Sequence, residues 1–159
     1  MTPQEKAILK TYILADQVLA PLTSGPGTDY GAIVAALNSD VSPTQLAWRA
    51  NVPIQEIDEA ADYTVFDAVV AGKRDSWGFF LGFPRDFTRA KVRTWVTDVW
   101  GPAILNSSAE KVLTAATKKS SRAEFALGGV SKTTGTVTAF NRNWIGDVNI
   151  NDIAEIFNA

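Results

Sequence analysis

The chain contains no cysteine and no histidine among its 159 residues. Without cysteine it can form no disulfide, use no thiolate nucleophile and offer no thiolate ligand to zinc. Without histidine it lacks the commonest general base and the commonest metal ligand, which excludes Ser-His-Asp triads and histidine-ligated metal hydrolases. Carboxylate, lysine, tyrosine and hydroxyl chemistry remain, but no set of these residues specifies a reaction. We therefore expect a protein that is not an enzyme and that uses no cofactor and no metal.

The sequence also lacks a hydrophobic run of the roughly 18–20 residues that span a bilayer. Residues 1–6 show no basic region followed by an apolar stretch, so a signal peptide is not expected. With 46% hydrophobic and 20% charged residues, the composition is that of a folded domain. These features predict a protein that is made in the cytoplasm and does not contact a membrane.

Capping signals and hydrophobic spacing predict a mainly α-helical fold. Helix starts are indicated at Thr2, Thr28, Ser42, Pro53, Ser107, Ser121 and Asn149. The expected helices cover residues 3–20, 29–37, 43–49, 53–65, 85–100, 108–119 and 150–157. Residues 130–140 are rich in threonine and valine, which predicts a β-hairpin or an extended arm. We predict a compact helical domain over residues 1–129, with the hairpin or arm and a terminal helix over residues 130–159 packed on it.

Charge is sorted along the chain. Residues 1–70 carry 3 basic and 9 acidic residues, whereas residues 71–122 carry 10 basic and 4 acidic residues. Residues 123–159 contribute −2, so balances of −6, +6 and −2 give the net charge of −2. Two interpretations remain open: the acidic and basic segments attract copies of the chain head to tail, or they neutralise each other within one fold.

Residues 76–84 form an aromatic segment interrupted by two glycines and a proline. Aromatic side chains in such a context are typical of interface anchors, although burial in the core is the commoner fate and is expected for about half of them. In the helix expected over residues 85–100, arginines four residues apart form a stripe beside the apolar face. This stripe fits an acidic protein partner or a nucleic-acid backbone, or else a solvated helix flank. The predicted protein interface comprises Trp77, Phe79, Phe80, Phe83, Arg85, Arg89 and Arg93.

Residues 44–63 have the spacing of a helix-turn-helix motif, which predicts a small DNA-binding regulator as the alternative function. The expected recognition helix is acidic, however, and carboxylates oppose contact with phosphates. Its acidic residues are Glu56, Asp58, Glu59 and Asp62. A weaker possibility is a carboxylate-based hydrolase using Glu56 and Glu59, although a solvated acidic face explains the same residues.

Three stretches carry a resemblance: residues 33–38, residues 41–57 with their prolines and tryptophan, and residues 118–124 leading to residues 147–153. Together they resemble small structural proteins of tailed bacteriophages. The resemblance implies a virion component at the head–tail junction, the tail or the tail tip, without enzymatic activity. Its implied partners are copies of itself and other virion proteins, with nucleic acid an unlikely partner. The resemblance agrees with symmetric assembly, and charge reversal at Arg89 and Arg93 is then expected to weaken assembly without unfolding the monomer.

Overall fold

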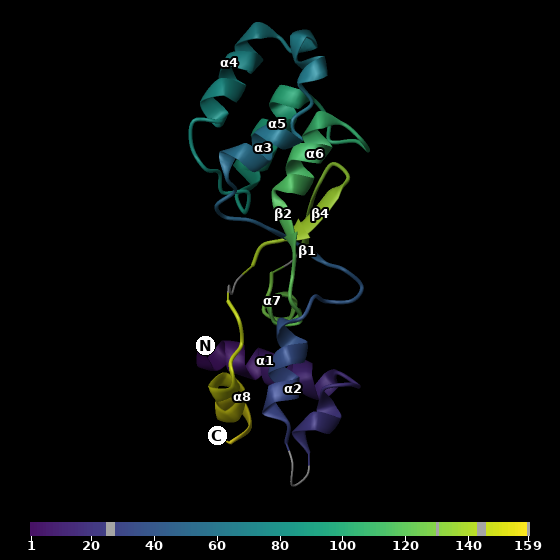
Figure 1. Ribbon diagram of the computed structural model, residues 1–159, viewed down its shortest axis with the longest axis vertical. Coiled ribbons are helices and arrows are strands. Elements are labelled where there is room, and N and C mark those ends of the chain that lie inside the picture. Colours follow the sequence, from purple (N-terminus) through teal and green to yellow (C-terminus); the bar gives the residue numbers. More distant parts are fainter. Residues whose placement is uncertain (25–27, 130, 143–145, 159) are drawn as a thin grey trace. The chain divides into compact units, whose positions relative to one another are not determined.

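The computed structural model describes residues 1–24, 28–129, 131–142 and 146–158. The chain divides into two units, each assembled from separate stretches of sequence (Figure 1). Unit 1 comprises Met1–Gln45, Lys119–Gly129 and Arg142–Ala159, and unit 2 comprises Leu46–Lys118 and Val130–Asn141. The chain therefore passes between the units four times.

Unit 1 is a group of helices. It contains α1 (Pro3–Ala15), the 3-10 helix η1 (Ala20–Thr23), α2 (Tyr30–Asn38), α7 (Arg122–Ala126) and α8 (Ile150–Phe157). Helices α1 and α2 each contact both α7 and α8. The buried core is almost entirely aliphatic: Leu9, Ile13, Leu19, Ile33, Leu37, Ala123, Leu127, Val148, Ile153 and Ile156. Burial of this shared apolar surface holds the separate stretches of unit 1 together.

The predicted capping signals explain where the helices of unit 1 begin. At α1 the Thr2 hydroxyl accepts a hydrogen bond from the Glu5 amide at 3.2 Å, and the Glu5 carboxylate accepts one from the Thr2 amide at 2.7 Å. The same reciprocal bonds occur at Ser121 and Asn149, so these three predicted helix starts are confirmed. The start of α2 differs by one residue from the prediction, because Asp29 is the residue that caps it.

Unit 2 contains the helices around the aromatic core. They are α3 (Ile54–Ala60), the 3-10 helix η2 (Tyr63–Ala68), α4 (Ala71–Phe80), α5 (Ala90–Trp100) and α6 (Ser108–Ala115). Helix α6 packs on α3 and α5, and α4 packs on α5. The largest fully buried side chains of this unit are Trp48, Trp77, Phe80, Phe87 and Phe140. The apolar face predicted for residues 92–100 is confirmed, since it packs into this core.

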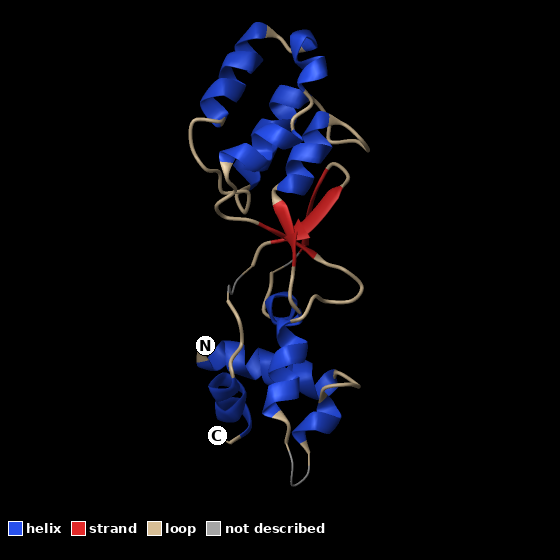
Figure 2. Ribbon diagram, in the orientation of Figure 1, coloured by secondary structure: helices blue, strands red, loops and turns tan. Residues whose placement is uncertain are grey.

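A small mixed sheet completes unit 2 (Figure 2). Its strands are β1 (Leu46–Trp48), β2 (Thr117–Lys119), β3 (Ser131–Thr134) and β4 (Val137–Phe140), in the order β2-β1-β4-β3. Strands β3 and β4 form an antiparallel hairpin, as predicted for residues 130–140, and β4 pairs in parallel with β1 through Ala47 and Phe140. The hairpin is thus part of a sheet and not a projecting arm, and the fold combines helices with this sheet.

The helix predicted over residues 43–49 is wrong, because residues 46–48 form β1. The Arg49 amide bonds to the Ala116 carbonyl and the Ser120 amide to the Gln45 carbonyl, so the backbone polar groups are satisfied by distant residues. The predicted helix at Pro53 is confirmed as α3. Residues 44–63 therefore form a strand and a helix, and the pair of helices that the helix-turn-helix interpretation requires is not formed there.

Several other predicted boundaries change. Helix α1 ends at Ala15 and not at residue 20, and α3 ends at Ala60 and not at residue 65. Helix α5 begins at Ala90, because residues 85–89 form a loop that bonds back to the residues beside β1. Helix α6 ends at Ala115, so Lys118 and Lys119 lie in β2 and not at a helix end. The division into residues 1–129 and 130–159 also differs from the observed one, because the hairpin belongs with unit 2 and α8 with unit 1.

Candidate functional site

The seven residues predicted to form the interface all fall in unit 2, but they do not share one surface. Trp77, Phe80 and Arg93 are buried. Phe79 and Phe83 leave 63% and 60% of their surface exposed. Arg85 is half-buried and Arg89 is exposed, so four of the seven residues can reach a partner.

The helical period of α4 explains this separation of the aromatic residues. Trp77 and Phe80 lie three residues apart on the face toward the core, where their rings stack 5.0 Å apart at an interplanar angle of 8°. The Trp77 indole donates a hydrogen bond to the Tyr63 hydroxyl at 3.0 Å. Phe79 points to the other side of α4, and Phe83 follows in the loop after the helix. Their rings lie 6.4 Å apart in an edge-to-face arrangement.

Arg85 holds the exposed phenylalanines in place. Its Nε donates to the Phe80 carbonyl at 2.6 Å and its terminal nitrogen donates to the Phe79 carbonyl at 2.7 Å. These carbonyls belong to the last turn of α4, where the helix dipole favours a cation. The Phe79 carbonyl also accepts a hydrogen bond from the Gly82 amide at 3.1 Å. The Arg85 guanidinium carbon is also 5.8 Å from each of the Phe79 and Phe83 ring centroids, within the range of cation–π attraction.

Two further rings complete the surroundings of Arg85. The guanidinium carbon lies 4.9 Å from the Phe80 ring centroid and 5.4 Å from the Trp95 ring centroid. Burial lowers the pKa of Arg85, and among the described residues no carboxylate forms an ion pair with it. We call the two exposed rings of Phe79 and Phe83 the phenylalanine knob. Both rings were predicted from the sequence as interface residues, but the bonds from Arg85 that hold them in place were not.

The arginine stripe predicted for one helix does not exist. Arg85 lies in the loop before α5, Arg89 occupies the position just before its first turn, and only Arg93 lies within the helix. Arg89 pairs with Asp86 at 3.1 Å on the surface. Arg93 points into unit 2 and bonds to backbone carbonyls, so it is a structural residue and not a surface contact.

A cavity of about 340 Å³ lies at the opposite end of α4, where sequence analysis predicted no site. Residues of η2, of the first turn of α4 and of the end of α5 line it: Val65, Ala68, Val69, Val70, Lys73, Val99, Trp100 and Gly101. We call it the valine pocket. The only sequence signal for it was the group of three valines in residues 65–70, two of which are exposed in the structure.

Charges of opposite sign meet within each unit. Unit 2 carries 10 basic and 9 acidic residues, a balance of +1, and unit 1 carries 5 basic and 8 acidic residues, a balance of −3. Pairs between the acidic and basic segments include Lys111 with Asp62 at 3.2 Å and Arg74 with Asp67 at 3.6 Å. The charge sorting seen along the sequence is thus largely removed by folding, as the second of the two interpretations expected.

Two carboxylates of the acidic segment, Glu56 and Asp62, are stabilised in their ionised form. A hydrogen bond from Arg49 lowers the pKa of Glu56, and hydrogen bonds from Thr64 and Lys111 lower the pKa of Asp62. A general acid in a carboxylate pair needs the opposite shift. Over the described ranges, no group of three or more acidic side chains is placed to hold a metal ion.

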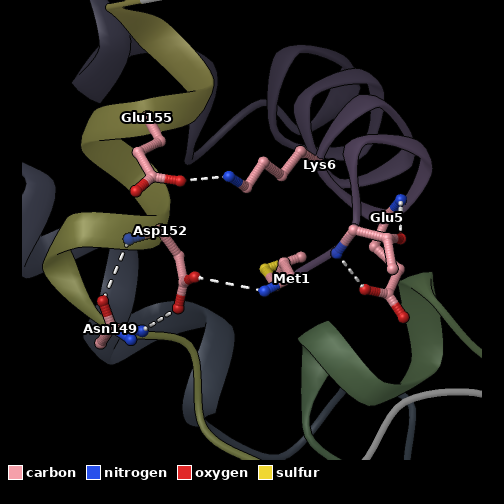
Figure 3. A network of polar contacts seen from close by, with 7 residues as sticks. Met1, Glu5, Lys6, Asn149, Asp152 and Glu155 are labelled. Carbon is pink, nitrogen blue, oxygen red and sulfur yellow. Dashed lines mark hydrogen bonds and ion pairs between the residues drawn. The ribbon is translucent and has the colours of Figure 1, made fainter.

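Unit 1 contains a larger cavity, of about 560 Å³, between α1 and α8. Lys6 and Glu155, which form an ion pair across it, are among its lining residues. Figure 3 shows this pair beside the capping boxes of both helices, with the amino group of Met1 3.8 Å from a carboxylate oxygen of Asp152. The network joins α1 to α8, so its charged groups already have partners.

Comparison with protein-family models, curated proteins and solved structures finds no match to this chain. In the described residues no helix is both long enough and apolar enough to cross a membrane. The phenylalanine knob and the valine pocket are two features of unit 2 that are open to a partner.

Proposed function

We propose that this chain is a structural assembly protein that acts by self-association through unit 2 and not by catalysis. The observation that carries the proposal is the phenylalanine knob. Two neighbouring phenylalanines are each more than half exposed, and the Arg85 guanidinium lies against both rings. Exposed aromatic anchors on a rigid support are typical of the energetic centre of a protein interface.

The setting within an assembly follows from the sequence resemblance to small structural proteins of tailed bacteriophages. In that setting the chain is a virion component of the head–tail junction, the tail or the tail tip. It is synthesised in the host cytoplasm and contacts copies of itself and other virion proteins. Ring assemblies of this kind use heterologous contacts, in which one surface meets a different surface of the next copy.

Sedimentation velocity and native mass spectrometry of the full chain, over a series of protein concentrations, test this proposal. We expect closed oligomers that increase with concentration. A chain that remains monomeric at every concentration would contradict self-association. The DNA-binding alternative is not proposed, because the structure forms a strand where its first helix is required.

A further inference from the structure

The phenylalanine knob and the valine pocket lie at opposite ends of the same helix. Val70 caps the first turn of α4, and Phe79 lies in its last turn. Ten helical residues separate the two ends by about 15 Å, given a rise of about 1.5 Å per residue. The two surfaces therefore do not overlap, and one copy of the chain can use both at the same time.

The pocket is large enough to receive the knob. The knob presents two adjacent aromatic rings, and the pocket is lined by four valines and a tryptophan together with the charged side chain of Lys73. Its volume of about 340 Å³ lies at the lower end of the range, about 300–1,000 Å³, that encloses small molecules, which leaves room for phenylalanine rings. An exposed projection and a pocket that receives it elsewhere on the same molecule produce a head-to-tail contact.

Charges beside the two surfaces are also complementary. The exposed amine of Lys73 lines the pocket. The exposed carboxylate of Asp75 lies one helical turn before Phe79 of the knob. The pocket thus carries a positive charge and the knob has a negative charge nearby, so that opposite charges can meet when the knob enters the pocket.

We infer that Phe79 and Phe83 of one copy insert into the valine pocket of the next copy. This inference rests on the proposed self-association and names the two surfaces that perform it. Because the surfaces differ, the contact is heterologous, and successive copies form a ring if the rotation between them closes. Single-stranded nucleic acid also stacks on exposed rings, but unit 2 has a balance of only +1, and nucleic-acid contacts need a strongly basic surface.

Two variants of the full chain remove one surface each. Phe79→Ser with Phe83→Ser removes the knob, and its matched control is Ile104→Ser with Leu105→Ser, a pair in unit 2 that is 63% and 74% exposed. Val70→Arg blocks the pocket, and its matched control is Val18→Arg, because these valines are 69% and 68% exposed. Circular dichroism and tryptophan fluorescence verify the fold. Phe83→Ser alone, in the loop after α4, replaces the double variant if that variant does not fold.

We expect each of the two variants to weaken self-association at least about 100-fold, the effect of losing two buried aromatic side chains, whereas both controls assemble as the unchanged chain does. Mixing then distinguishes the modes of association. The knob-less variant retains a pocket and the pocket-blocked variant retains a knob. A 1:1 mixture should therefore form heterodimers, and no larger species, in sedimentation velocity and native mass spectrometry.

Several outcomes would overturn the inference. If the unchanged chain associates and either variant associates equally well, the surface altered in that variant is not used, although the proposed assembly function stands. If both variants are monomeric and their mixture is too, the contact is not of knob with pocket. A chain that is monomeric throughout contradicts both proposals. Tight binding of a fluorescein-labelled oligothymidylate, lost in the knob-less variant, would assign the knob to nucleic acid.

Discussion

The guanidinium carbon of Arg93 lies 4.8 Å from the ring centroid of Trp48, inside unit 2. Arg93 is 4% exposed and donates to the carbonyls of Phe87 and Thr88. A cation in this position satisfies loop carbonyls that the protein has removed from water. Its role is therefore to fix the loop before α5 onto the core.

Charge reversal consequently has different effects at Arg93 in α5 and at Arg89 just before it. Arg93→Glu should lower the free energy of unfolding by at least about 3 kcal/mol, because it leaves buried carbonyls unpaired and places a carboxylate beside them. Arg89→Glu should change it by less than about 1 kcal/mol, because it breaks only an exposed ion pair. Urea unfolding measures both. Equal effects would contradict the structural role of Arg93. An Arg93→Glu protein of unchanged stability would restore the expectation that charge reversal at this residue leaves the monomer intact.

The bracing role of Arg85 is tested by its replacement with an apolar side chain of similar length. Arg85→Met should cost about 1.5–3 kcal/mol, because the bonds from a charged donor to the Phe79 and Phe80 carbonyls are lost. Arg89→Met removes the same charge from the same loop and should have little effect. Denaturant unfolding gives the comparison. If the two variants are equally stable, Arg85 does not brace the end of α4.

Two glycines should respond in opposite ways to alanine. Gly78 lies in the interior of α4 with open space around it, so Gly78→Ala should stabilise the protein by about 1 kcal/mol. Gly135 has φ +61°, and an added Cβ would lie 2.1 Å from the Ala103 carbonyl oxygen. Gly135→Ala should therefore destabilise by at least about 2 kcal/mol. Thermal unfolding of both variants checks the signs, and stabilisation by Gly135→Ala would refute the hairpin geometry.

Acid should destabilise the fold through its paired carboxylates. Hydrogen bonds from Arg49 to Glu56 and from Thr64 to Asp62 lower the pKa of each carboxyl group in the folded chain. The unfolded chain then binds more protons, so this stability is present above the ordinary pKa values of 4.5 and 3.8 and is lost as the pH falls through the lowered values. Unfolding midpoints should decline below about pH 5.

Glu56→Gln should reduce that decline. Glu59→Gln makes the same change of charge in the same helix and is the matched control, because Glu59 forms no ion pair in the part of the chain that the structure describes. A steeper decline in Glu56→Gln than in the control would show that the bond with Arg49 does not favour the ionised form of Glu56.

Self-association should depend only weakly on salt. The inferred contact is centred on apolar side chains, and the acidic and basic segments largely neutralise each other within unit 2. We expect the dissociation constant to change by less than about tenfold between about 50 mM and about 500 mM salt, measured by sedimentation velocity. A much larger loss of affinity would favour the charge-sorted interface inferred from the sequence.

Local signals predicted the helix starts well because capping acts between residues three apart. The expected capping bonds form at Thr2, Ser121 and Asn149, in each case with the residue three positions later in the sequence. The same local signal failed at residues 43–49. There, Ala47 in β1 pairs with Phe140 in β4, which lies far later in the sequence. The residues near position 47 therefore do not reveal this contact.

The candidate site was predicted in part for a similar reason. Composition identified the aromatic segment, and the expectation that about half of it would be buried agrees with the positions of Trp77 and Phe80. The place of Arg85 depends on the loop of residues 85–89, whose backbone bonds to Val52 and Arg49. The valine pocket likewise needs η2 and the end of α5 to meet, so the spacing of its residues in the sequence gives no signal.

The interleaved order of the two units constrains how the chain can be made. Unit 1 needs α8, which packs on α1 and α2, so its core cannot close during synthesis until the last helix has left the ribosome. Unit 2 needs β4, and it can close earlier, once residues up to 141 have emerged. Helices α1 and α2 therefore lack their packing partner α8, and remain partly unfolded, while unit 2 completes its fold.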